Sequence, residues 1–226
     1  MPILIIGLIL LFLLTQLPYW WTKAILKKYA TPDPTIPGTG GEFAQHLIKK
    51  FHLPITVEVT EQGDHYDPLQ KVVRLSYDNY HTNSLTAIAT VAHEIGHALQ
   101  DHQHYEPLYQ RTELIQRSQW LRKFSAIALT ATPILIPLMH TPVIGMITFG
   151  AGFIAMGVPV MIHLATLPVE FDASFKRALP LLKSGNYLND KQLKIAHRIL
   201  LACALTYVAA SLSSLLNLWK WFKGNR

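Results

Sequence analysis

The chain has 226 residues, enough for one substantial hydrophobic core, but only 15% of them are charged while 50% are hydrophobic. Since a soluble domain carries about a quarter charged residues, this composition favours a membrane protein with a polar domain between apolar segments. The net charge of +6 does not indicate a nucleic-acid partner, because the Lys and Arg residues mostly flank apolar runs. The single cysteine, Cys203, excludes a disulfide framework and a CxxC zinc site.

The first apolar run begins at Ile3 and ends near Trp20 and Trp21, which are followed by lysines. A helix from Ile3 to Trp21 would be about 28 Å long, enough to cross the apolar core of a bilayer. A cleaved signal peptide is the alternative, but the run lacks a preceding positive charge and a following A-x-A-like site. We predict a transmembrane anchor at residues 1–22, with the domain after it in the cytoplasm because lysines follow the span.

A polar region over residues 31–120 begins with a Pro/Gly-rich linker and is predicted to be the first part of a catalytic domain. A capping box that starts at Thr39 predicts an amphipathic helix over Glu42–His52. Alternation of apolar and polar residues predicts a half-buried strand at Ile55–Thr60, and Lys71–Ser76 is predicted as a second strand. We expect this second strand to offer an edge to an extended peptide substrate.

The next predicted helix, Leu85–Gln100, is rich in Ala and can be capped by Asn83 or Ser84. It contains the sequence HEIGH, an instance of HExxH. Gly96 within this motif costs the helix about 1 kcal/mol relative to Ala. The cost indicates that another backbone, or a metal site, approaches the helix closely at this position.

The HExxH motif supplies two imidazoles at helical spacing. His93 and His97 are four residues apart, so they lie on one face of the helix and can bind one Zn²⁺. Glu94 lies beside them and can reach a metal-bound water without being a ligand. The motif therefore predicts a zinc site in the polar domain.

The rest of the chain alternates between apolar and polar segments. Two apolar runs with several Gly and Pro residues predict a transmembrane hairpin at residues 124–165. Residues 166–198 are polar and are predicted to be the second part of the catalytic domain. A final apolar run predicts a transmembrane helix at residues 199–222.

A catalytic zinc site usually has three protein ligands, so the HExxH pair needs a partner. The metzincin pattern would place Gly at position 100 and His at position 103, where this chain has Gln100 and Gln103. His102 and His104 are off that spacing, and we expect them to be polar surface residues. The third ligand is therefore sought further along the chain.

Glu170 is the stronger candidate for the third ligand. It follows Pro168, a residue that fits the first turn of a helix, so Glu170 could face inward from that turn. From the residues alone, an equally good interpretation is a glutamate that stabilises the N-terminal end of the helix dipole.

The motif HEIGHALQ, followed much later by LPVEFDAS, resembles the YugP-like neutral zinc metallopeptidases of bacterial membranes. The segments TGGE, DHYDP and ALTYVA are similar to the same family, so the resemblance covers nearly the whole chain. Peptidases of the related HtpX type pair HExxH with a later glutamate, and Ser174 stands where those have Asp. The resemblance implies a zinc metalloendopeptidase of the gluzincin type, with one Zn²⁺ per chain held by His93, His97 and Glu170, and Glu94 as general base.

We therefore expect a mainly α fold: a polytopic, multi-pass protein of the cell membrane whose small α+β zincin-like domain combines the HExxH helix with a short sheet. The expected function is peptide-bond hydrolysis with a zinc-activated water at the cytoplasmic membrane face. The expected substrate is a membrane-associated or unfolded polypeptide, with a role in membrane protein quality control or processing. The alternative is a non-catalytic zinc-binding adaptor or scaffold, although a structural zinc site would be closed by a fourth ligand.

The hydrolysis of a peptide bond also needs a hydrogen-bond donor for the oxyanion. His65 and Tyr66, in the polar loop predicted at Gly63–Pro68, and Tyr207 are candidates for this donor. No feature of the sequence places any of them at the metal.

Overall fold

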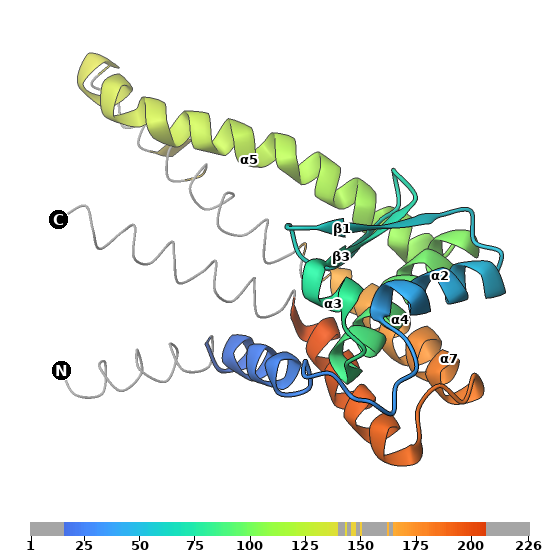
Figure 1. Ribbon diagram of the computed structural model, residues 1–226. Coiled ribbons are helices and arrows are strands. Elements are labelled where there is room, and N and C mark those ends of the chain that lie inside the picture. The colour runs from blue at the N-terminus through green and yellow to red at the C-terminus, as the bar shows by residue number, and fades with distance from the viewer. Residues whose placement is uncertain are drawn as a thin grey trace, which may run out of the picture.

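The computed structural model describes residues 16–139 and 165–206, together with residues 143, 146, 147, 150 and 162 (Figure 1). Residues 16–28, 165–171 and 190–206 are helical. The other helices and strands are α2 (Gly40–Lys50), β1 (Thr56–Thr60), β2 (His65–Asp67), β3 (Val72–Ser76), α3 (Tyr77–His81), α4 (Leu85–His102), α5 (Glu106–Met139), the π-helix η1 (Asp172–Ala178) and α7 (Leu179–Ser184).

The three strands form one sheet in the order β1–β3–β2. β1 runs parallel to β3, and β2 runs antiparallel to it with Tyr66 opposite Val73. Since β3 is hydrogen-bonded on both sides, the prediction that Lys71–Ser76 offers an edge to a peptide is wrong. In the described part of the chain, β2 has an unpaired edge and lies next to α4. This strand falls within the segment that we predicted to be a loop. Three residues are too few for an alternation pattern to reveal a strand.

The predicted capping box and helix at the start of the polar region are confirmed. The side chain of Thr39 accepts a hydrogen bond from the backbone N–H of Glu42, and the Glu42 carboxylate accepts one from the backbone N–H of Thr39 at 2.8 Å. These two bonds satisfy N–H groups that a helix end leaves without intrahelical partners. Phe43 and Leu47 on the apolar face of α2 are buried against the core.

The helix α4 is the centre of the molecule and carries the HExxH motif, as predicted. Its N-cap is Ser84, whose side chain accepts a hydrogen bond from the backbone N–H of Ala87 at 3.1 Å. Helix α4 contacts the sheet, α2, α3, α5, α7 and η1. Figure 1 shows α4 lying among these elements. Residues such as Val91 and Ile95 are therefore completely buried. The motif is held rigidly because its helix forms the core.

The glycine in the motif allows η1 to pack directly on α4, as the sequence indicated. A Cβ atom on Gly96 would lie 2.6 Å from the carbonyl oxygen of Ala173, which is too close for any real contact. The backbone of η1 thus passes directly over the turn of α4 that carries the two histidines. This close approach brings the segment that contains Glu170 to the motif.

Replacing Gly96 by Ala is expected to destabilise the protein and to weaken its metal site. Overpacking against the backbone costs about 1–3 kcal/mol, and the better helix propensity of Ala recovers about 1 kcal/mol. Chemical denaturation should show a lower free energy of unfolding, and a zinc titration should show weaker binding. A variant with wild-type stability and zinc affinity would contradict the close packing of η1 on α4.

The predicted class of polytopic membrane protein is contradicted by the structure. No helix among the described residues is both long and apolar enough to cross a bilayer. In the 34-residue helix α5, charged residues such as Arg117 and Lys123 precede the apolar part, and Pro133 and Pro137 interrupt it.

We predicted three membrane-spanning segments, at residues 1–22, 124–165 and 199–222. Much of each of these segments lies outside the described residues.

Candidate metal centre

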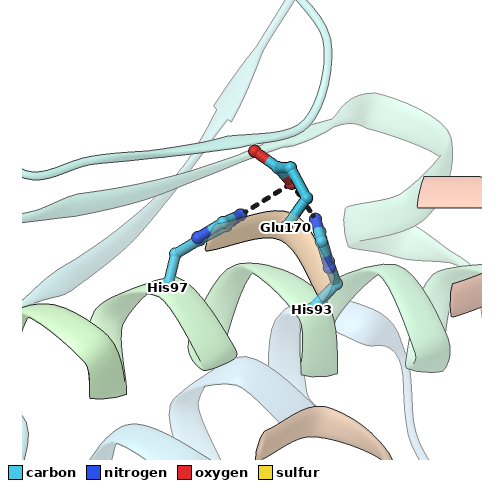
Figure 2. Close-up of side chains that lie close together, drawn as sticks. All are labelled: His93, His97 and Glu170. Atoms are coloured by element: carbon cyan, nitrogen blue, oxygen red, sulfur yellow. Dashed lines mark hydrogen bonds and ion pairs between the residues drawn. The ribbon is translucent and has the colours of Figure 1, made fainter. Parts of the chain in front are cut away.

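Two histidines from α4 and a glutamate from a distant segment converge in the buried interior of the protein. Figure 2 shows His93 and His97 rising from one helix and Glu170 approaching them from a neighbouring segment. The Nε2 atom of His93 and that of His97 each lie 3.2 Å from the Oε2 atom of Glu170. All three side chains are buried. The structure thus brings together the three residues that the sequence singled out as zinc ligands.

The spacing of these three atoms fits a tetrahedral zinc ion. Zinc binds His nitrogen and carboxylate oxygen at about 2.0–2.1 Å, which places neighbouring tetrahedral ligand atoms about 3.4 Å apart. The observed separations of 3.2 Å are close to this value, and all the ligand atoms lie within 4.8 Å of one another. Zn²⁺ could therefore be held with little movement of these side chains.

The hydrogen bonds of Ser174 determine which nitrogen of His93 carries the proton. The Ser174 hydroxyl donates its only hydrogen to the carbonyl oxygen of Leu200 at 3.1 Å, and its oxygen lies 2.9 Å from His93 Nδ1. Since the hydroxyl proton is already used, Nδ1 must be the donor in the second bond. The lone pair of Nε2 therefore points toward Glu170. Ser174 thus does by a hydroxyl what a carboxylate commonly does for a metal-binding histidine.

Gln100 determines the proton position of His97 in the same way. Its side-chain nitrogen donates to the carbonyl oxygen of Val169 at 2.8 Å and to Asp172 Oδ1 at 2.9 Å, so its Oε1 must face His97. That oxygen lies 2.9 Å from His97 Nδ1, which is therefore protonated. Gln100 thus orients His97, a proposed ligand. The sequence did not predict this role, because there Gln100 was only a residue that differs from the metzincin pattern.

These hydrogen bonds create a need for a cation between the three side chains. With both Nδ1 atoms protonated, a neutral His93 and a neutral His97 direct only lone pairs at the Glu170 carboxylate. Buried lone pairs that face one another without a proton or a metal are unfavourable. A metal ion can accept a lone pair from all three groups at once. Without a metal, each histidine ring would need a second proton to donate a hydrogen bond to the carboxylate.

Arg111 holds the other oxygen of the Glu170 carboxylate. Its Nη1 atom lies 3.0 Å from Glu170 Oε1, and its side chain is largely buried. Burial alone would raise the pKa of Glu170, but the positive charges that surround it in the metal-free protein, Arg111 among them, hold this pKa well below its ordinary value. Glu170 is therefore an anion that presents Oε2 to the metal position and Oε1 to Arg111.

Arg111 was not among the candidates from the sequence. The signal that could have identified it is the helical stripe of Leu108, Arg111 and Ile115 in α5, where one cation interrupts an apolar face.

Glu94 lies beside the metal cluster without belonging to it. Burial raises the pKa of Glu94 to about 7, with smaller contributions from Glu170 and Asp64, while His93 and the backbone N–H of Tyr66 act in the opposite direction. A carboxyl group whose pKa lies near neutral pH can both accept and return a proton. This is the property that a general base next to a metal needs.

A cavity of about 400 Å³ opens beside His93, Glu94, His97 and Arg111. Of the oxyanion donor candidates, His65 and Tyr66 line this cavity, whereas Tyr207 lies outside the described residues.

The contacts of His65 and Tyr66 limit what each can donate to an oxyanion. The hydroxyl of Tyr66 donates to Asp101 at 2.5 Å and is thus already occupied. His65 Nδ1 donates to the carbonyl oxygen of Gly63 at 2.8 Å. Its Nε2 atom can therefore act as a donor only when the ring is protonated.

Two further expectations are tested by the structure. His102 and His104 are exposed, as predicted. The helix that carries Glu170 does not begin at Pro168, because residues 165–171 are already helical. Glu170 is therefore beyond the first turn, and the role of a dipole-stabilising terminal residue does not fit its position.

Comparisons with known proteins match nearly the whole chain. The model of a family described as "Putative neutral zinc metallopeptidase" matches residues 3–225. A protein of Bacillus subtilis (strain 168) named "Putative membrane protease YugP" is 32% identical over 203 residues, which are 88% of this chain and 86% of that protein. No solved structure matches the chain significantly. The family match includes both segments that carry the three converging side chains.

Proposed function

The chain belongs to the neutral zinc metallopeptidase family, and from this premise we propose that it is a zinc-dependent endopeptidase of the gluzincin type. In this proposal His93, His97 and Glu170 hold one Zn²⁺ per chain, and Glu94 is the general base. The observation that carries the proposal is the convergence of three lone-pair donors beside the buried carboxyl group of Glu94, with the Nε2 atom of each histidine 3.2 Å from Glu170 Oε2.

Each residue of the site has a defined task in hydrolysis. A bound zinc ion acts as a Lewis acid that polarises the scissile carbonyl and makes water more acidic. Glu94 removes a proton from the attacking water and returns it to the nitrogen of the leaving amine. Ser174 and Gln100 keep the lone pairs of His93 and His97 directed at the metal position.

The edge of β2 offers a place for the substrate backbone. β2 lies against α4, and the backbone N–H of Tyr66 already faces Glu94. An extended peptide added to this edge would run past the metal position, with its amides paired to the strand. This geometry favours cleavage within a polypeptide. In this proposal the substrate pairs with β2 rather than with β3, the strand that the sequence predicted for this role.

The alternative of a zinc-binding adaptor or scaffold is less well supported. A structural zinc site is closed by four protein ligands, whereas the cluster found among the described residues has three. The cavity beside the cluster leaves room for water and substrate.

We further propose that the substrate is a membrane-associated or unfolded polypeptide, and that cleavage occurs at the cytoplasmic face of the cell membrane during protein quality control or processing. The support is the distribution of Lys and Arg along the sequence and the name of the B. subtilis relative, a "Putative membrane protease".

Removal of the metal is expected to abolish cleavage reversibly. Dialysis of the purified full-length protein against a chelator should reduce casein cleavage to background, and one equivalent of Zn²⁺ should restore it, because the proposed hydrolysis depends on the Lewis acid. Metal analysis should find one zinc per chain before dialysis and after restoration. Full cleavage by protein shown to be free of metal would reject the proposed mechanism.

A further inference from the structure

A second cavity, of about 440 Å³, lies next to the metal cavity between α5 and the residues around the β2–β3 turn. Four residues line both cavities: His65, Tyr66, His97 and Arg111. A metal ligand is therefore shared between the two spaces. A polypeptide bound across the metal position would place a side chain in the second cavity.

The wall of the second cavity is mostly uncharged. Its apolar part comes from the turn and from α5, and includes Leu69, Leu108 and Ile115. Its neutral polar part comes from α5, through Thr112, Gln116 and Gln119. Such a surface favours an apolar side chain large enough to displace water from most of the wall.

The charges at the cavity disfavour a basic side chain. The one acidic residue among its lining residues is Asp67, whose carboxylate accepts hydrogen bonds from the backbone N–H groups of Leu69 and Gln70 and pairs with Arg74 at 3.2 Å. Arg111, on the side of the metal position, is likewise paired with Glu170 at 3.0 Å. A Lys or Arg side chain would thus lose its hydration in this cavity without finding an available acid.

We propose that this second cavity is the subsite for the substrate side chain on one side of the scissile bond. It selects a large, uncharged apolar residue and rejects Lys and Arg. The proposal rests on the proposed peptidase function and adds to it the determinant of sequence preference.

The size of the subsite can be tested by filling it. The full-length protein, loaded with zinc, is given a peptide library, and its cleavage sites are identified by mass spectrometry. Ile115→Trp is expected to reduce cleavage next to Leu, Phe and Met about tenfold or more relative to cleavage next to Ala. The preference on the other side of the scissile bond should not change. Zinc content and circular dichroism check that the variant is folded.

The charge of the subsite can be tested at an exposed position. Gln116→Glu places an acid at the cavity, and cleavage next to Lys and Arg should rise about tenfold. Gln110→Glu makes the same change elsewhere on α5, where Gln110 is exposed and its side chain bonds to Glu106 at 3.4 Å. This control should leave the wild-type preference unchanged. Because Gln116 is exposed, the test remains valid even if Ile115→Trp fails to fold.

The outcomes separate the subsite from the peptidase function. Wild-type cleavage with the preference described, altered by Ile115→Trp and Gln116→Glu but not by Gln110→Glu, supports the subsite. Cleavage whose sequence preference is the same in the wild type and in the folded variants overturns the subsite and leaves the peptidase standing. Absence of any cleavage by the zinc-loaded wild type overturns both.

Discussion

Replacing Glu94 by Gln is expected to reduce peptide cleavage by about 10²–10⁴-fold while the protein keeps one bound zinc. In the proposed mechanism this carboxyl takes the proton of the attacking water, and in the metal-free protein burial raises its pKa to about 7. The amide of Gln has almost the same shape but cannot accept the proton. Casein cleavage and metal analysis on the same preparation measure the two quantities. Equal cleavage by the variant and the wild type would reject Glu94 as the base.

A loss of activity through unfolding can be distinguished by the pH dependence of stability. In the metal-free protein, burial raises the pKa of Glu94 from 4.5 to about 7. The folded state therefore binds this proton more tightly than the unfolded state, and the free energy of unfolding falls as the pH rises from 4.5 through 7. The loss amounts to about 3 kcal/mol above that window. Glu94→Gln lacks it, so above pH 7 the metal-free variant should be more stable than the wild type.

Replacing Glu170 by Gln is expected to remove zinc from the purified protein. The variant retains the size of the side chain but loses the anionic oxygen that lies 3.2 Å from both histidine nitrogens. The loss of affinity should exceed the 10–100-fold effect that is typical of residues behind the ligands. Metal analysis and competition with a zinc chelator measure the effect.

The matched control for this prediction is Glu113→Gln. It makes the same chemical change at an exposed residue of α5, whose partner is Arg117 in the next turn. Its zinc content should be unchanged, because surface ion pairs contribute little to stability. If Glu170→Gln retained one tightly bound zinc, Glu170 would no longer be a ligand, and the three-ligand centre would have to be abandoned.

Local sequence patterns were sufficient for the elements that depend on neighbouring residues. The capping box at Thr39 and the cap at Ser84 depend on groups within three residues, so α2 and α4 could be predicted with their starts close to those observed. The same reasoning placed His93 and His97 on one face of a helix. The cost of Gly96 within that helix correctly indicated a close approach.

Patterns of hydropathy were less reliable for the fold class. The apolar composition favoured a polytopic membrane protein. A membrane span requires a single helix that is both long enough and apolar enough, and no described helix meets both conditions. The short strand β2 was missed because hydrogen bonds to β3 define it, and these form only in the folded sheet.

By itself the sequence identified the two histidines proposed to bind the metal and the glutamate proposed as the base beside them, and resemblance to a family suggested Glu170 as their partner. Only the tertiary structure decided how those groups are oriented. Ser174 and Arg111 act on side chains that lie 81 and 59 residues away in the sequence, and Gln100 acts on a side chain in the adjacent turn of its helix. Their hydrogen bonds and charges determine which lone pairs face the metal position. Such contacts depend on the packing of η1 and α5 against α4, which no local pattern of residues encodes.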